Sequence, residues 1–248
     1  MVKRWRPPQR LKQPIRSVVA RTGYEFVAIS RPETRFLTDL LGVHRVSLLV
    51  DVGANQGQYA QHMRTLGYQG KILSFEPGGE AHRLLLRNSS NDAPWEVRRL
   101  ALGASSAQGW LNVSHDSVSS SLLEVAAPHV RVAPMSSASY TEQVQVSTLD
   151  QELPNMEKER IWLKLDTQGS EDDILRGGYR LLPYVQVLQT EINLVDCYAG
   201  QADYRTIFDM AHSAGLLLVR VEPGTQDQET GELLQFDAIF GRASGEIL

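Results

Sequence analysis

The sequence is poor in cysteine and has no long apolar run. Cys197 is the one cysteine among 248 residues, which excludes an internal disulfide and a cysteine-based metal cluster. No apolar stretch approaches the roughly 20 residues of a membrane-spanning helix, and the basic N-terminus lacks the apolar core of a secretory signal. We therefore expect a cytoplasmic protein. A hydrophobic content of 42% and a charged content of 22% are ordinary for a globular chain.

Negative charge is absent from the first part of the chain. The formal net charge is −4, yet seven basic residues precede the first acid, Glu25. Such a segment either contacts an anionic membrane, making the protein peripheral at the inner membrane face, or is a solvated tail, which is the commoner case. Because the rest is acidic and has no aromatic-basic stripe, we do not expect nucleic acid as a partner. The seven residues are Lys3, Arg4, Arg6, Arg10, Lys12, Arg16 and Arg21.

From residue 46 onwards, apolar runs typical of strands alternate with helical patterns. This alternation predicts an α/β fold with a mostly parallel, seven-stranded sheet and helices on both faces. The polar stretch 223–231 between the last two strands predicts a hairpin, and hence an antiparallel edge strand. We expect strands near 47–51, 71–75, 96–101, 161–166, 185–191, 215–221 and 235–241, and helices near 57–67, 79–88, 170–182 and 203–214.

The chain before this domain is expected to be a short helical extension. Residues 15–29 have an apolar helical face, and a second helix is expected near 32–41, with a proline at its start and a glycine after its end. The sequence therefore predicts an N-terminal extension over 1–45 and one main domain over 46–242.

The segment 103–143 breaks the alternation. It is rich in serine, alanine and proline, and a connection of this length is either functional or mobile. We expect residues 119–123 to lie over a binding site as a lid. The following TEQVQVSTLD predicts a strand that turns at Asp150.

The stretch LLVDVGANQGQY, from Leu48 to Tyr59, has the pattern of a buried strand, a tight turn and a helix start. Gly53 and Gly57 lack a Cβ, so the backbone can adopt positive φ and let a ligand approach closely. The unpaired N–H groups of the next helix face the turn. The pattern predicts a nucleotide-like ligand at the carboxyl end of the first strand.

The acids near the strand ends favour one kind of ligand. Asp51 would repel a pyrophosphate, and Asn55 stands where the dinucleotide motif has a second glycine. A carboxylate suits instead the amine and sulfonium of S-adenosylmethionine. Glu76, in SFEP after the second strand, has about the spacing of an acid that binds ribose hydroxyls.

These motifs together resemble the FkbM-type S-adenosylmethionine-dependent O-methyltransferases. The resemblance covers residues 46–242 and is carried by DVGANQGQY, SFEP, STLD and KLDTQGSEDDIL. It implies a Rossmann-like class I methyltransferase fold and methylation of a hydroxyl, probable acceptors being sugars of glycolipids, polysaccharides or secondary metabolites. The sequence departs from the family pattern at Gly78, Gly79, Asp196 and Cys197. The donor-binding residues implied are Asp51, Gly53, Ala54, Asn55, Gly57, Glu76, Pro77, Ala101, Leu102 and Asp166.

Methylation of a hydroxyl needs a base that removes its proton. Asp166 and Glu191 stand at or near the ends of two predicted strands, where they would face the crevice above the sheet. Each has an alternative role: Asp166 could cap a helix or hold the donor's ammonium, and Glu191 could anchor a loop. His115, in the serine-rich segment, is a third candidate with a suitable pKa, or an exposed loop histidine.

Other functions share parts of this pattern. A nicotinamide-dependent oxidoreductase would also have a Rossmann fold, but the third glycine and a Tyr-x-x-x-Lys pair are missing. A non-catalytic cofactor-binding scaffold would need the pocket and no base. No dense cluster of acids such as D-x-D appears, so we expect no metal ion.

Overall fold

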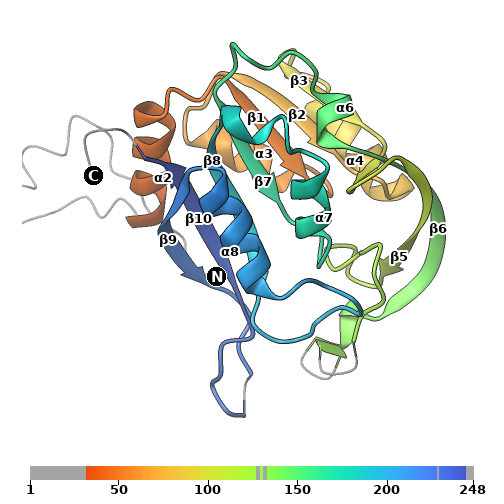
Figure 1. The fold of residues 1–248 in the computed structure, drawn as a ribbon. Helices are drawn as coiled ribbons and strands as arrows, with labels where there is room; N and C mark the ends of the chain where they lie inside the picture. The colour runs from red at the N-terminus through yellow and green to blue at the C-terminus, as the bar shows by residue number, and fades with distance from the viewer. Residues whose placement is uncertain (1–31, 127–128, 131–132, 228, 244–248) are drawn as a thin grey trace, which may run out of the picture. The chain divides into compact units, whose positions relative to one another are not determined.

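A computed structural model describes residues 32–126, 129–130, 133–227 and 229–243 (Figure 1). The helix expected at 15–29 and the seven basic residues lie outside this part of the chain. The second expected helix is confirmed as α2, Pro32–Val43. From Leu40 onwards the chain forms one compact unit; the expected division after residue 45 stays a prediction. Among the described residues, no helix combines the length and the apolar character needed to cross a membrane.

The predicted seven-stranded sheet is confirmed. Its strand order is β3-β2-β1-β7-β8-β10-β9, and all neighbouring pairs are parallel except those of β10, which runs antiparallel to β8 and β9. The antiparallel strand therefore lies one place in from the edge, which β9 forms. The strands are β1 Leu48–Val52, β2 Lys71–Phe75, β3 Trp95–Arg98, β7 Ile161–Leu165, β8 Val185–Asn193, β9 Leu216–Pro223 and β10 Gln235–Arg242.

Helices cover both faces of this sheet, as expected from β1 and β7, in which every residue is buried (Figure 1). Ile174 and Ile207, from α7 and α8, share a core cluster with Val50 and Val52 of β1. Ala60 and Met63 of α3 are fully buried outside that cluster. The helices are α3 Gln58–Thr65, α4 Gly79–Ser89, α7 Glu171–Arg176 and α8 Tyr204–Ser213.

A second, three-stranded sheet replaces the irregular segment expected between residues 103 and 143. Its central strand β6, Ala138–Ser147, pairs antiparallel with β5, Ala107–Ser114, and parallel with β4, Ala101–Leu102. The strand expected at 96–101 was therefore wrong at its end, because β3 stops at Arg98 and Ala101 belongs to the small sheet. The core of this sheet is small, with Ala101, Leu111 and Val144 buried together, and so its hydrophobic pattern is weak. Short helical turns flank it: η2 Pro134–Ser136 and α6 Leu149–Glu152.

The helix expected at 170–182 is much shorter in the structure. It ends at Arg176 and is followed by two glycines and the 3₁₀ turn η3, Leu182–Tyr184. A Cβ on Gly177 would lie 2.1 Å from the carbonyl oxygen of Gly103, and one on Gly178 would lie 2.7 Å from the side chain of Leu149. The glycines thus end the helix where it meets the segment that leads to the small sheet.

Candidate functional site

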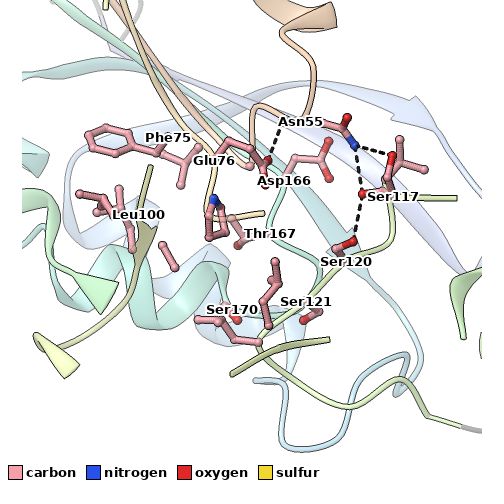
Figure 2. Close-up of a pocket in the computed structure, with 18 residues that line it drawn as sticks. Asn55, Phe75, Glu76, Leu100, Ser117, Ser120, Ser121, Asp166, Thr167 and Ser170 are labelled. Atoms are coloured by element: carbon pink, nitrogen blue, oxygen red, sulfur yellow. Dashed lines mark hydrogen bonds between the residues drawn. The ribbon is translucent and has the colours of Figure 1, made fainter. Parts of the chain in front are cut away.

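A cleft opens at the carboxyl ends of β1, β2 and β7 (Figure 2). Its empty volume, which includes space open to solvent, is about 530 Å³. Seven of the ten expected donor-binding residues line it, which are Gly53, Asn55, Glu76, Pro77, Ala101, Leu102 and Asp166. Asp51, Ala54 and Gly57 are not among the described residues that line this cleft.

The two glycines of the loop after β1 have different roles. Gly53 has φ of 75°, and a Cβ there would lie 2.0 Å from the carbonyl oxygen of Asp166, so only glycine fits between the loop and β7. Gly57 has φ of 87° and precedes α3, but its Cβ position faces Trp95 and Leu85 at 2.7–2.8 Å. Gly57 therefore allows close packing against Trp95 and Leu85, whereas Gly53 lets the loop pass close to the backbone of Asp166.

Glu76 holds the loop through the backbone. Its two carboxylate oxygens accept hydrogen bonds from the N–H of Asn55 and the N–H of Gly78, each at 2.8 Å. Burial raises the pKa of Glu76 to about 7, despite these two hydrogen bonds. Asn55 adopts a left-handed backbone with φ of 48°, and within the described chain no donor reaches its buried Oδ1. The loop thus presents an unused acceptor beside a titratable carboxylate.

The segment that follows β5 closes over the cleft, where we expected a lid. Asn55 Nδ2 donates to the carbonyl of Ser117 at 3.0 Å (Figure 2). Ser121 Oγ donates to the carbonyl of Gln168 at 2.7 Å. Ser120 and Leu122 also line the cleft. The segment is therefore fastened to the loops after both β1 and β7.

Lys164 joins Asp166 to Asp51. Its Nζ lies 3.0 Å from Oδ2 of Asp166 and 3.6 Å from Oδ1 of Asp51, so the charge of this buried lysine has two carboxylate partners. Burial opposes the charge of Lys164, but the two carboxylates outweigh it and raise its pKa. Burial likewise raises the pKa of Asp51, and Lys164 opposes this shift. Asp51 is fully buried, so its side chain belongs to this ion pair beneath the cleft.

Asp166 and Glu191 are brought together by Gln168. Gln168 Nε2 donates to Asp166 Oδ1 at 2.7 Å and to Glu191 Oε2 at 3.2 Å, and Gln235 Nε2 donates to the same oxygen of Glu191 at 3.1 Å. Burial, and then the charge of Asp166, raise the pKa of Glu191 well above its usual value. Tyr198 is 1% exposed and donates its hydroxyl hydrogen to Gln168.

The sequence profile of the methyltransferase FkbM domain matches residues 51–224 of this chain. The chain belongs to the FkbM methyltransferase family. Residues 51–224 therefore form a domain of the S-adenosylmethionine-dependent methyltransferase type, and the sheet has the Rossmann-like fold that the resemblance implied. This membership decides against the nicotinamide-dependent alternative.

Individual relatives of this FkbM methyltransferase are distant. Methyltransferase sdnD of Sordaria araneosa is 33% identical over 100 residues, which span 36% of this chain and 39% of that protein. An FkbM methyltransferase of Methylobacillus flagellatus KT has a TM-score of 0.47 at 13% identity, covering 79% of this chain and 43% of that one. A putative O-methyltransferase of Klebsiella pneumoniae has a TM-score of 0.45 at 13% identity, covering 96% and 92%.

The residues of this FkbM methyltransferase fit a bound donor in two respects. The orphaned Oδ1 of Asn55 can accept from an ammonium or hydroxyl group, and the carboxylate of Glu76 can accept from hydroxyls. Among the described residues, no three His, Cys, Asp or Glu side chains are grouped so that they could hold a metal ion.

Glu171 is a functional-site residue that the sequence did not reveal. Its carboxylate is 2% exposed and accepts hydrogen bonds from the N–H and the hydroxyl of Thr167 and from the N–H of Gly169, at 2.9–3.1 Å. Glu171 thereby fixes the turn that carries Asp166. An acid two residues after a turn glycine is the signal for such a role, but it reads equally as the first residue of α7, which Glu171 also is.

His115 is separated from the two acids. It lines a neighbouring cavity together with Glu80 and Tyr140, and this cavity meets the cleft at Glu76 and Ser117. The structure thus brings Asp166 and Glu191 together and places His115 on the other side of the lid segment.

Proposed function

We propose that this methyltransferase transfers the methyl group to a hydroxyl oxygen of a small polar acceptor, a sugar of a glycolipid, polysaccharide or secondary metabolite. The observation that carries the proposal is the hydrogen-bonded pair of Asp166 and Glu191 beside the cleft. A hydroxyl group must lose its proton as it is methylated, and a carboxylate within reach is the simplest base for this.

The donor would be held by the residues around the glycine loop. Asn55 and Glu76 would accept hydrogen bonds from the donor, Gly53 would admit its approach, and Pro77, Ala101 and Leu102 would form the apolar wall. When bound, S-adenosylmethionine supplies a methyl group on a sulfonium, which an oxygen nucleophile displaces. Asp51, Ala54 and Gly57 would support the loop from behind, Asp51 through Lys164.

Asp166 is the preferred base. Its side chain is 41% exposed, so it can meet an acceptor, and Lys164 donates to it from below at 3.0 Å. The acceptor's hydroxyl proton would pass to a carboxylate oxygen of Asp166. Glu191 would receive a hydrogen bond from, or donate one to, a neighbouring hydroxyl, and His115 would contact the acceptor only if the acceptor extends past the lid segment.

The N-terminal extension completes the proposal. We expect residues 1–45 to act as a unit distinct from the domain over 46–242. The seven basic residues would bring the cytoplasmic enzyme to an anionic membrane when its acceptor is a glycolipid.

Two measurements test the proposal. Isothermal titration should detect binding of S-adenosylhomocysteine, and Asp166→Asn and Glu191→Gln should each retain that affinity while methyl transfer is lost. Mass spectrometry of glycolipids and polysaccharides from cells with and without the protein should find one acceptor whose mass differs by a single methylene group. Loss of the added methyl group in mild base would instead indicate a methyl ester. Methyl transfer that persists in the double variant Asp166→Asn/Glu191→Gln would show that neither acid is the base.

A further inference from the structure

Gln168 occupies an unusual position between the two acids. Its backbone has φ of 59°, a left-handed conformation that is unfavourable for a non-glycine residue. The residue is 8% exposed. Such local strain persists where the surrounding structure imposes it, commonly at functional sites. The turn is imposed by Glu171, which binds the N–H groups on both sides of Gln168.

The carboxamide of Gln168 has a fixed orientation. The hydroxyl of the buried Tyr198 donates to Oε1, so Nε2 points at the carboxyl oxygens of Asp166 and Glu191. The reverse orientation would aim the amide oxygen at two carboxyl groups and would lose both donors. Tyr198 is itself held in place, because its ring packs against Gly169, where a Cβ would lie 3.0 Å away.

Asp166 and Glu191 have different hydrogen-bond donors and different charged neighbours. Asp166 accepts from Lys164 on Oδ2 and from Gln168 on Oδ1. Glu191 faces Gln168 and Gln235, and the acids Asp166, Glu171 and Asp237 lie near enough to disfavour its charge, with Lys164 acting in the opposite sense. The carboxyl groups of Asp166 and Glu191 share the amide of Gln168 as a donor, but they lie in different electrostatic environments.

We propose that Gln168 is a positioning residue whose carboxamide, clamped by Tyr198, holds the carboxyl groups of Asp166 and Glu191 in register. This inference rests on the proposed function, because it names the residue that orients the proposed base within that site. Each N–H of the amide donates to one carboxyl group, so the two acids are held together without an added charge.

The experiment follows the titration of Glu191 in the full-length protein. Carboxyl carbons of ¹³C-labelled glutamate are observed by NMR across pH, and the Glu191 signal is assigned by its loss in Glu191→Gln. We compare wild type with Gln168→Leu, Gln168→Glu and Tyr198→Phe, and use Gln108→Leu, an exposed amide on β5, as the matched control. Circular dichroism checks that each variant is folded.

Loss of the amide donor should raise the pKa of Glu191 by about one unit in Gln168→Leu and by more in Gln168→Glu. Tyr198→Phe should shift it in the same direction by less, and Gln108→Leu should leave it unchanged. An unchanged titration in folded Gln168→Leu, or in Tyr198→Phe if Gln168→Leu does not fold, overturns the inference. Affinity for S-adenosylhomocysteine, measured on the same samples, separates the two proposals: a wild type that does not bind it contradicts the proposed function, whereas binding with an unchanged titration contradicts the positioning role alone.

Discussion

The ammonium of Lys164 lies 3.6 Å from the carboxylate of Asp51, which has no exposed surface and accepts no hydrogen bond from the described residues. An ion pair of this kind gains its stability from mutual attraction, because neither charge has water as an alternative partner. The ion pair also connects β1, which precedes the glycine loop, to β7, which precedes Asp166.

Removal of one partner should therefore be costly. We expect Lys164→Met to lower the free energy of unfolding by about 3–5 kcal/mol, because Asp51 is left buried and unpaired. The double variant Asp51→Asn/Lys164→Met should recover part of this loss. Urea denaturation measures Lys164→Met, Asp51→Asn and the double variant. Arg35→Met, at an exposed pair with Asp39, is the control and should cost no more than about 0.5 kcal/mol. Additive losses in the double variant would contradict the coupling.

Glu76 should make donor binding depend on pH. Its pKa is raised to about 7 by burial, and only the ionised carboxylate accepts from two hydroxyls. Affinity for S-adenosylhomocysteine, measured by calorimetry, should rise as pH increases from 6 to 8. Glu76→Gln should weaken binding at pH 8 by about 1–3 kcal/mol and make it nearly independent of pH. A wild-type affinity that is constant over this range would argue against a contact with Glu76.

The same carboxyl group should affect stability with the opposite sign. Because its pKa in the folded protein exceeds the usual 4.5, the ligand-free protein binds more protons than the unfolded chain between pH 4.5 and 7. The stability contributed by this group is full below pH 4.5 and is lost as pH rises through 7. Urea midpoints at pH 5 and 8 should differ more in wild type than in Glu76→Gln, and equal differences would contradict the raised pKa.

Gly53 should tolerate no side chain. Gly53→Ala places a methyl group 2.0 Å from the carbonyl oxygen of Asp166, so the loop must move away from β7. We expect binding of S-adenosylhomocysteine to be lost and the melting temperature to fall. Gly67→Ala is the matched control: Gly67 also has positive φ, but nothing lies within 4 Å of its Cβ position. It should lose only about 1–2 kcal/mol and should keep its affinity.

Retention of a bound ligand by the lid segment, residues 117–122, should depend on Asn55. Asn55→Gly retains a residue suited to φ of 48° but removes the hydrogen bond to Ser117. We expect faster dissociation of S-adenosylhomocysteine in stopped-flow measurements, with a further increase when Ser121→Ala removes the bond to Gln168. Ser90→Ala, which loses only a bond within its own helix end, is the control. Equal dissociation rates in all variants would show that the segment does not retain the ligand.

Local signals in the sequence were sufficient for the main sheet and the glycine loop. Continuous apolar strands, a positive-φ glycine at Gly53 and an acid after β2 each arise from neighbouring residues. They located most of the cleft, including Asn55, Glu76 and Asp166.

Features that depend on distant partners were not predictable. The strand β1 continues to Val52, so Asp51 lies within the strand and its side chain points to a face of the sheet rather than into the cleft. Gln168 meets Glu191 and Tyr198 from 23 and 30 residues away, and its backbone conformation has no sequence signature. The small sheet pairs β5 with β6 across a long connection, and its core of three buried residues gives little periodicity.

The short helix α7 connects opposite ends of the cleft. It begins at Glu171, which fixes the turn of Asp166, and ends where Gly177 rests against the backbone of Gly103, the residue that follows Ala101 and Leu102 in the chain. Six residues are too few for the helix to bend, so α7 can move only as a rigid unit. A substitution that displaces the backbone of Gly103 would therefore also displace the turn that carries Asp166, because one helix joins the two.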